Sequence, residues 1–217
     1  MSAAERLISS DDHVDLAHDA IKANLTTKYH AAYDAALMEF GMGMAKTMSS
    51  KANGLWRKQQ GLAPKEIAGM TALSERSYPA AGRAGHTDAQ ARLDDMDADG
   101  IDQSVMYCEV SAFRYLYLLK EGNREATRAF NQTMTEFGSL APDRMIVSYQ
   151  IPIHDIDGAV AEVRWVAASG GKSLQLPVFP AELGLPDYWD ERYDPLWAAI
   201  QETGLPICLH IGLNTQL

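Results

Sequence analysis

The sequence predicts an α/β protein built on a parallel sheet. Short apolar runs of strand length alternate with longer segments in which apolar residues recur every three or four positions. Glycine follows several of the helical segments, and Asp, Asn or Thr precedes them. The strand-like runs recur at intervals of roughly 30–40 residues, the length of a strand–helix–strand unit.

The composition is that of an ordinary globular protein and excludes some partners. The chain has 217 residues, 47% of them hydrophobic and 22% charged, with a net charge of −10. That charge argues against nucleic acid, which binds a basic face. The only cysteines, Cys108 and Cys208, form neither a disulfide framework nor a zinc motif. With no signal-peptide pattern and no apolar run of about 20 residues, we expect a cytoplasmic protein without membrane contacts.

The first predicted strand covers residues 7–13, and an irregular region of about residues 16–85 follows it. One helix stands out in this region because five apolar residues recur at helical spacing. They are Tyr33, Leu37, Phe40, Met44 and Met48. Packing in the core or between subunits explains this stripe more simply than contact with a cofactor. Residues 53–83 show no period, which predicts a long loop.

From residue 86 onward, helices and strands alternate regularly. The predicted helix starts are a capping box of Thr87 with Gln90, then Asn123, Asp155 or Asp157, and Asp194. Glycines stop three of these helices at Gly100, Gly170-Gly171 and Gly204. The strands that follow are predicted at residues 104–108, 145–149, 173–176 and 205–212.

These repeats imply parallel strands joined by right-handed crossovers. An open doubly wound sheet and a (β/α)8 barrel both satisfy the pattern. The chain has no GxGxxG and no Walker-type loop, which weakens the nucleotide-binding forms of the open sheet. In either architecture, functional groups gather at the carboxyl ends of the strands.

Acidic and histidine side chains end the first strand. Residues two apart on a strand face the same side, so Asp11 and His13 point together while Asp12 points away. A carboxylate and an imidazole suit Zn²⁺, Mn²⁺ or a similar ion. A capping carboxylate and a hydrogen-bonded loop histidine explain the pair too, and the spacing alone favours that simpler interpretation.

His210 ends the last apolar strand. A buried imidazole needs hydrogen-bond partners or a metal, so His210 is either a ligand or a satisfied histidine at a strand end. Cys208, two residues before His210, shares its face of the strand and is best explained as a small core residue. Glu109 and Gln150 follow other strands, so their side chains point either to the same edge of the sheet or to solvent. The remaining histidines have the setting of surface or loop residues; they are His18, His30, His86 and His154.

Four stretches resemble the amidohydrolase-related metal enzymes, in the branch of aminocarboxymuconate semialdehyde decarboxylase and the hydroxybenzoate-type decarboxylases. They are residues 8–14 (ISSDDHV), 92–102 (RLDDMDADGID), 141–144 (APDR), and 193–197 (YDPLW) leading to 206–210 (PICLH). Their order and spacing are more specific than any one stretch. The resemblance covers about residues 7–15 and 86–213.

The resemblance implies a (β/α)8 barrel with one divalent metal ion, zinc or manganese, at its carboxyl-terminal mouth. The family's metal ligands correspond here to Asp11, His13 and His210. It further implies a hydrolase or decarboxylase for a small substrate with a carboxylate or carbonyl group, aromatic acids included. The region 16–85 would be an insertion that covers the mouth or forms an interface, such as that of a homo-oligomer.

The sequence departs from the family pattern at two points. The family's histidine after the sixth strand and aspartate after the eighth would lie beyond Leu217, so no catalytic residue is assignable within residues 1–217. We therefore expect the N-terminal part of one longer barrel, or a truncated copy, with about five of the eight units. The alternative is a non-catalytic barrel fragment that binds partners through its open sheet. Leu16 stands where a glutamate is common in this branch.

Overall fold

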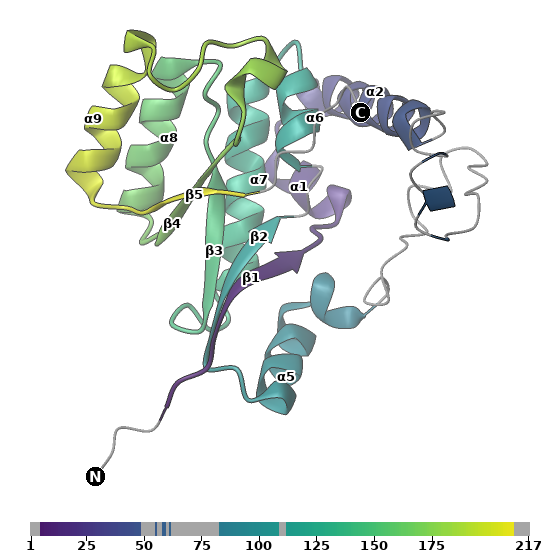
Figure 1. Cartoon of the computed structure of the whole chain (residues 1–217), viewed down its shortest axis with the longest axis vertical. Coiled ribbons are helices and arrows are strands. Elements are labelled where there is room, and N and C mark those ends of the chain that lie inside the picture. The colour runs from purple at the N-terminus through teal and green to yellow at the C-terminus, as the bar shows by residue number, and fades with distance from the viewer. Residues whose placement is uncertain are drawn as a thin grey trace.

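The computed structural model describes residues 5–48, 83–108 and 112–210, together with residues 55, 58, 59 and 61. Five parallel strands form one sheet in the order β1-β2-β3-β4-β5 (Figure 1). They span Ile8–Val14, Gln103–Cys108, Met145–Gln150, Ser173–Leu176 and Ile207–Leu209. Each strand lies beside the one that precedes it in the chain, whereas a doubly wound sheet reverses its order at a switch point. The topology is therefore that of the barrel.

Contacts across the inner face show that the sheet is curled. β1 and β5 are four positions apart, which would separate them by about 19 Å in a flat sheet. The Asp11 carboxylate of β1 nevertheless lies 2.8 Å from the imidazole of His210, the residue after β5. The five strands thus form an incomplete (β/α)8 barrel with β1 and β5 at its edges.

Helices connect the strands and cover the outer face of the sheet. They are α5 (Ala89–Asp99) before β2, α6 (Ala112–Leu118) and α7 (Asn123–Gly138) before β3, α8 (Ile156–Ala168) before β4, and α9 (Asp194–Thr203) before β5. α7 packs against β3, and α8 packs against α9 (Figure 1). Short 3-10 turns occur at Thr27–Tyr29, Ala84–His86, Pro180–Leu183 and Glu191–Tyr193. Within the part of the chain that the structure describes, no helix is long and apolar enough to cross a membrane.

The main hydrophobic core lies between the sheet and these helices. Met106 pairs in register with Val147, and Tyr149 pairs with Leu174, so each pair shares one face of the sheet. All four side chains are buried. The Tyr149 ring meets the Trp165 ring of α8, which identifies this face as the one covered by helices.

The region predicted as an insertion contributes α1 (His18–Asn24) and α2 (His30–Met48) to the described part of the chain. α1 packs on α7, and α2 packs on α6. The buried Tyr33 hydroxyl of α2 donates to the Tyr115 hydroxyl of α6 at 3.2 Å. The predicted helical stripe is thus present, although the side chains of Met44 and Met48 lie outside the described residues, as does nearly all of the predicted loop. A cap or interface role for residues 16–85 stays a prediction.

Three predicted helix starts need correction. α5 begins after Asp88, whose carboxylate accepts the Ala91 backbone N–H at 2.7 Å, and not at the predicted Thr87–Gln90 box. The N-caps of α7 and α9 are Gly122 and Tyr193, so Asn123 and Asp194 are the first helical residues. Apolar periodicity locates a helix but does not choose among adjacent polar residues for its cap. The predicted Asp155 cap of α8 is confirmed.

The last strand is an exposed edge, which corrects the prediction of a buried strand over residues 205–212. Among the described residues β5 covers Ile207–Leu209, and the side chains of Ile207 and Leu209 are 40% and 54% exposed. Residues 211 and 212 of the predicted strand lie outside the described residues. The exposure of Ile207 and Leu209 follows from the absence of a covering helix after β5 among the described residues. At the other edge, Leu7 and Ile8 are also more than half exposed.

Candidate metal centre

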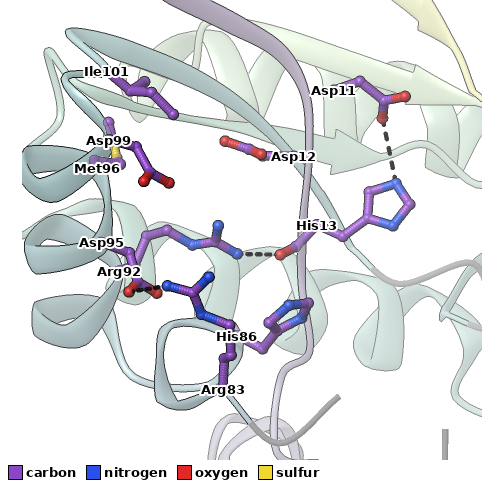
Figure 2. Close-up of a pocket in the computed structure, with 10 residues that line it drawn as sticks. All are labelled: Asp11, Asp12, His13, Arg83, His86, Arg92, Asp95, Met96, Asp99 and Ile101. Atoms are coloured by element: carbon purple, nitrogen blue, oxygen red, sulfur yellow. Dashed lines mark hydrogen bonds and ion pairs between the residues drawn. The ribbon is translucent and has the colours of Figure 1, made fainter. Parts of the chain in front are cut away.

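A bulge in β1 contains Asp11, the first of the predicted ligands. Ser9 pairs with Ser104 and Asp12 pairs with Met106, so β1 has one residue more than β2 over this stretch. Bulges of this kind re-aim the side chains that follow them. Asp12 accepts a hydrogen bond from the Ser104 hydroxyl. Figure 2 shows Asp11 and His13 on the other side of the strand, as the alternation predicted.

His210 completes a cluster of three donor groups. Its Nε2 lies 2.8 Å from Asp11 Oδ1 and 3.3 Å from His13 Nε2. His13 Nε2 lies 3.4 Å from the same Asp11 oxygen. The histidine side chains are 29% and 12% exposed, and that of Asp11 is 65% exposed. The structure therefore brings together the three residues that the sequence analysis selected, with the carboxylate on the open side.

The spacing of these atoms fits one shared ion. Metal–nitrogen and metal–oxygen bonds of about 2.0–2.2 Å separate neighbouring ligand atoms by about 2.8–3.6 Å in tetrahedral or octahedral coordination. The observed distances of 2.8, 3.3 and 3.4 Å fall in that range. One carboxylate and two imidazoles suit zinc and manganese. Among the described residues, no other group of three such side chains converges in this way.

The protonation of His13 also suits a ligand. Burial lowers the pKa of His13, and the neighbouring His210 lowers that pKa further, whereas Asp11 opposes the shift. A lowered pKa favours the neutral imidazole, which has the free electron pair that a metal requires.

Two residues that the sequence analysis did not single out support the cluster. The Tyr107 ring of β2 stacks on the His210 imidazole, with ring centroids 4.1 Å apart and planes 5° from parallel. Arg92 of α5 donates to the backbone carbonyls of His13 and Gly85, the latter at 2.8 Å. Tyr107 pairs in register with His13 and so shares its face. The sequence analysis missed Tyr107 because the register between β1 and β2 is not encoded in either strand alone.

A cavity of about 360 Å³ lies between β1 and α5, on the side of β1 opposite to the Asp11 and His13 side chains (Figure 2). Its lining is Asp11, Asp12, His13, Arg83, His86, Arg92, Asp95, Met96, Asp99 and Ile101. Arg83 and Asp95 form an ion pair at 2.5 Å across one wall. The cavity is large enough for a small ligand, and it is lined mainly by polar groups.

The other candidates near this edge do not join the cluster. Gln150 is buried and donates to the Cys108 thiol at 2.9 Å. Cys208 Sγ lies 3.2 Å from the Ser173 hydroxyl. Glu109 lies outside the described residues. Of the remaining histidines, His154 is partly buried and lies in the turn between β3 and α8, which agrees with the predicted surface or loop setting.

The sequence matches no family model and no curated protein, but the structure resembles solved enzymes. The 5-carboxyvanillate decarboxylase of Novosphingobium aromaticivorans, complexed with manganese and 4-hydroxy-3-methoxy-5-nitrobenzoic acid, is 18% identical with a TM-score of 0.59. The match covers 95% of this chain and 50% of that one. An amidohydrolase of Mycobacterium avium subsp. paratuberculosis is 19% identical with a TM-score of 0.65, over 98% and 60% of the two chains. The 2,6-dihydroxybenzoate decarboxylase of Rhizobium is 17% identical with a TM-score of 0.52, over 95% and 50%.

The chain therefore spans between half and 60% of the length of these proteins. The shared fold confirms the predicted incomplete (β/α)8 barrel. It also confirms the predicted likeness to amidohydrolase-type enzymes, which the matching stretches of sequence had indicated.

Proposed function

We propose that this chain carries the metal centre of a metal-dependent enzyme of the amidohydrolase type. Asp11, His13 and His210 are the proposed ligands of one zinc or manganese ion. The observation that carries the proposal is their convergence, from both edges of the sheet, at the carboxyl end of parallel strands. Barrel enzymes have their active sites at this end.

The proposed substrate class is a small molecule with a carboxylate or carbonyl group, which is decarboxylated or hydrolysed. Two of the similar enzymes are decarboxylases of aromatic acids, and one of their structures contains manganese with a nitrobenzoic acid. A divalent ion at this centre would supply a Lewis acid that polarises a carboxylate or carbonyl oxygen.

Metal stoichiometry tests the proposal. The 217-residue chain, stripped with a chelator and reloaded with Mn²⁺ or Zn²⁺, should retain about one ion after gel filtration, measured by elemental analysis. His210→Asn should lose most of that ion. His154→Asn is the matched control, because His154 lies outside the cluster. Equal metal content in wild type and His210→Asn would contradict the assignment of His210 as a ligand.

Ligand binding tests the substrate class separately. Mn²⁺ on the protein enhances the relaxation of water protons, and a ligand that displaces metal-bound water reduces this enhancement. A hydroxylated benzoic acid should reduce it, whereas the corresponding benzyl alcohol, which lacks the carboxylate, should not. Identical responses to both compounds would contradict a carboxylate substrate.

The exposed edges favour a second function, that of an interaction module. Leu7 and Ile8 at one edge and Ile207 and Leu209 at the other present apolar side chains beside strand edges that are unpaired within the described residues. Unpaired edges recruit further strands. This function predicts that the mass measured by light scattering rises with protein concentration and that Ile207→Lys reduces the rise. A constant monomer mass would exclude self-association through these edges.

A further inference from the structure

Tyr107 contacts the far edge of the sheet from β2. The residue is only 7% exposed, and its ring lies parallel to the His210 imidazole at a centroid distance of 4.1 Å. β3 and β4 separate β2 from β5 in the sheet. The stacking is therefore made across the inside of the curled sheet, at the level of the donor cluster.

A second side chain lies near the Tyr107 ring. Burial and the neighbouring thiol of Cys208, two residues before His210, raise the pKa of the Tyr107 hydroxyl. Residues two apart in an extended segment share a face, so Cys208 of β5 and His210 after it both face Tyr107. The Tyr107 side chain thus meets the end of the sheet at two successive inward-facing residues.

The stacking of Tyr107 on His210 limits the directions in which Nε2 of the imidazole can point. His13 meets the same imidazole edge-on, with planes 86° apart and centroids 4.9 Å apart. The terminal torsion of a histidine is broad, so a free ring turns easily about its Cβ–Cγ bond. Such a turn would move Nε2 away from Asp11, which lies 2.8 Å away. Tyr107 covers one face of the ring and opposes the turn.

We propose that Tyr107 is a positioning residue that holds the His210 imidazole in the orientation required to bind the metal. This inference rests on the proposed metal centre. Ligand histidines are commonly oriented by a hydrogen bond to their second ring nitrogen. Within the described part of the chain, no such bond reaches Nδ1 of His210, and the ring stack takes that role.

The stack also acts on the metal-bound form directly. An imidazole that donates electrons to a divalent ion becomes electron-poor, and the electron-rich face of tyrosine attracts such a ring. Tyr107 therefore stabilises the bound state more than the free state. Removing its ring should weaken metal binding even if the apo protein keeps its fold.

The test compares Tyr107→Phe, which keeps the ring, with Tyr107→Leu, which fills similar space without an aromatic face. Metal dissociation constants come from competition with a chelator, and the Co²⁺ absorption spectrum reports coordination. Tyr107→Phe should stay within about twofold of wild type, and Tyr107→Leu should bind about 10–100-fold more weakly, as orienting residues do. The Co²⁺ bands should change in Tyr107→Leu alone.

Tyr149→Leu is the matched control, because Tyr149 is a buried tyrosine on β3 that faces the helices. Its metal affinity should equal that of wild type. If wild type binds no metal, the proposed function fails, and this inference fails with it. If wild type binds metal but Tyr107→Leu binds equally well, or Tyr149→Leu weakens binding as much, only the positioning role is overturned. Should Tyr107→Leu fail to fold, Tyr107→Met repeats the comparison with the same expected loss.

Discussion

The Asp11 carboxylate and the His210 imidazole lie 2.8 Å apart although 199 positions separate them in the chain. β1 and β5 stand at opposite edges of the sheet, so only its curl brings these side chains together. A ligand held by both residues would tie the two edges of the half-barrel to each other. Metal binding and stability are therefore expected to be linked.

Adding metal should stabilise the folded chain. When an ion binds only the folded state and its free concentration is 100 times the dissociation constant, it adds about 2.7 kcal/mol to the free energy of unfolding. For a chain of this size, the unfolding midpoint should rise by about 5–10 °C. Thermal unfolding with and without Mn²⁺ measures the shift, and excess chelator should reverse it.

Two carboxylate variants make this prediction specific. Asp11→Asn replaces the anionic carboxylate beside both imidazoles with a neutral amide and should abolish most of the shift. Asp143→Asn alters an exposed carboxylate that is paired with Lys172 and should retain it. Equal shifts in both variants would show that the stabilising ion binds elsewhere.

Glu162 is expected to be the most sensitive position in a buried polar network between α7 and α8. Its side chain is 5% exposed and accepts from Arg128 and from Asn131, each at 2.8 Å. Asn131 also donates to the Gln150 carbonyl of β3. Glu162→Ala leaves the buried Asn131 amide without this acceptor and the partly exposed Arg128 without its partner, so it should lower the free energy of unfolding by about 2 kcal/mol. Urea denaturation measures the change.

An exposed ion pair between α8 and α9 provides the control. Arg164 and Glu202 interact at 3.3 Å, and both side chains are more than 60% exposed. Solvent screens such pairs, so Glu202→Ala should cost at most about 1 kcal/mol. A loss as large as that of Glu162→Ala would contradict the role of burial.

The stability of the chain should fall in mild acid because of His154. Burial is the main cause that lowers the pKa of this imidazole below its ordinary 6.5, and Arg124 and Arg192 add to the effect. The unfolded chain therefore takes up this proton at a higher pH than the folded chain. The contribution of neutral His154 to the free energy of unfolding is complete above pH 6.5 and is lost as the pH falls through the folded-state pKa. Urea denaturation from about pH 7 to about pH 5 should show the decline, and His154→Gln should make it shallower; an unchanged slope would contradict the assignment.

Two adjacent glycines after α8 should respond differently to substitution. A Cβ at Gly171 would lie 2.4 Å from Val166 Cγ1 and 2.8 Å from a ring carbon of Tyr149, so Gly171→Ala should cost about 1–3 kcal/mol through overpacking. Gly170 has open space but a φ of 78°, which an alanine adopts at a cost of about 1–2 kcal/mol. Asparagine tolerates that backbone conformation. Gly170→Asn should therefore be milder than Gly170→Ala, whereas Gly171→Asn should be at least as severe as Gly171→Ala.

Local patterns were sufficient to locate most elements of the sheet. β4 coincides with its predicted run, and β2 and β3 differ from theirs by one residue at an end. The apolar residues of each strand alternate with turn and cap residues, and this signal does not depend on the rest of the chain. The cap of α5 was wrong because Thr87 and Asp88 are adjacent and both cap well. The exposure of β5 was missed because apolar composition identifies a strand but not the elements that cover it.

The sequence by itself determined the alternation of strands and helices, the common face of Asp11 and His13, and the position of His210 at a strand end. Each of these follows from spacing along a few residues. Only the tertiary structure decided that the sheet curls, that the three donors lie within 3.4 Å of one another, and that Tyr107 stacks on His210. These facts depend on strand register and on the twist summed over five strands, which no single stretch of sequence contains.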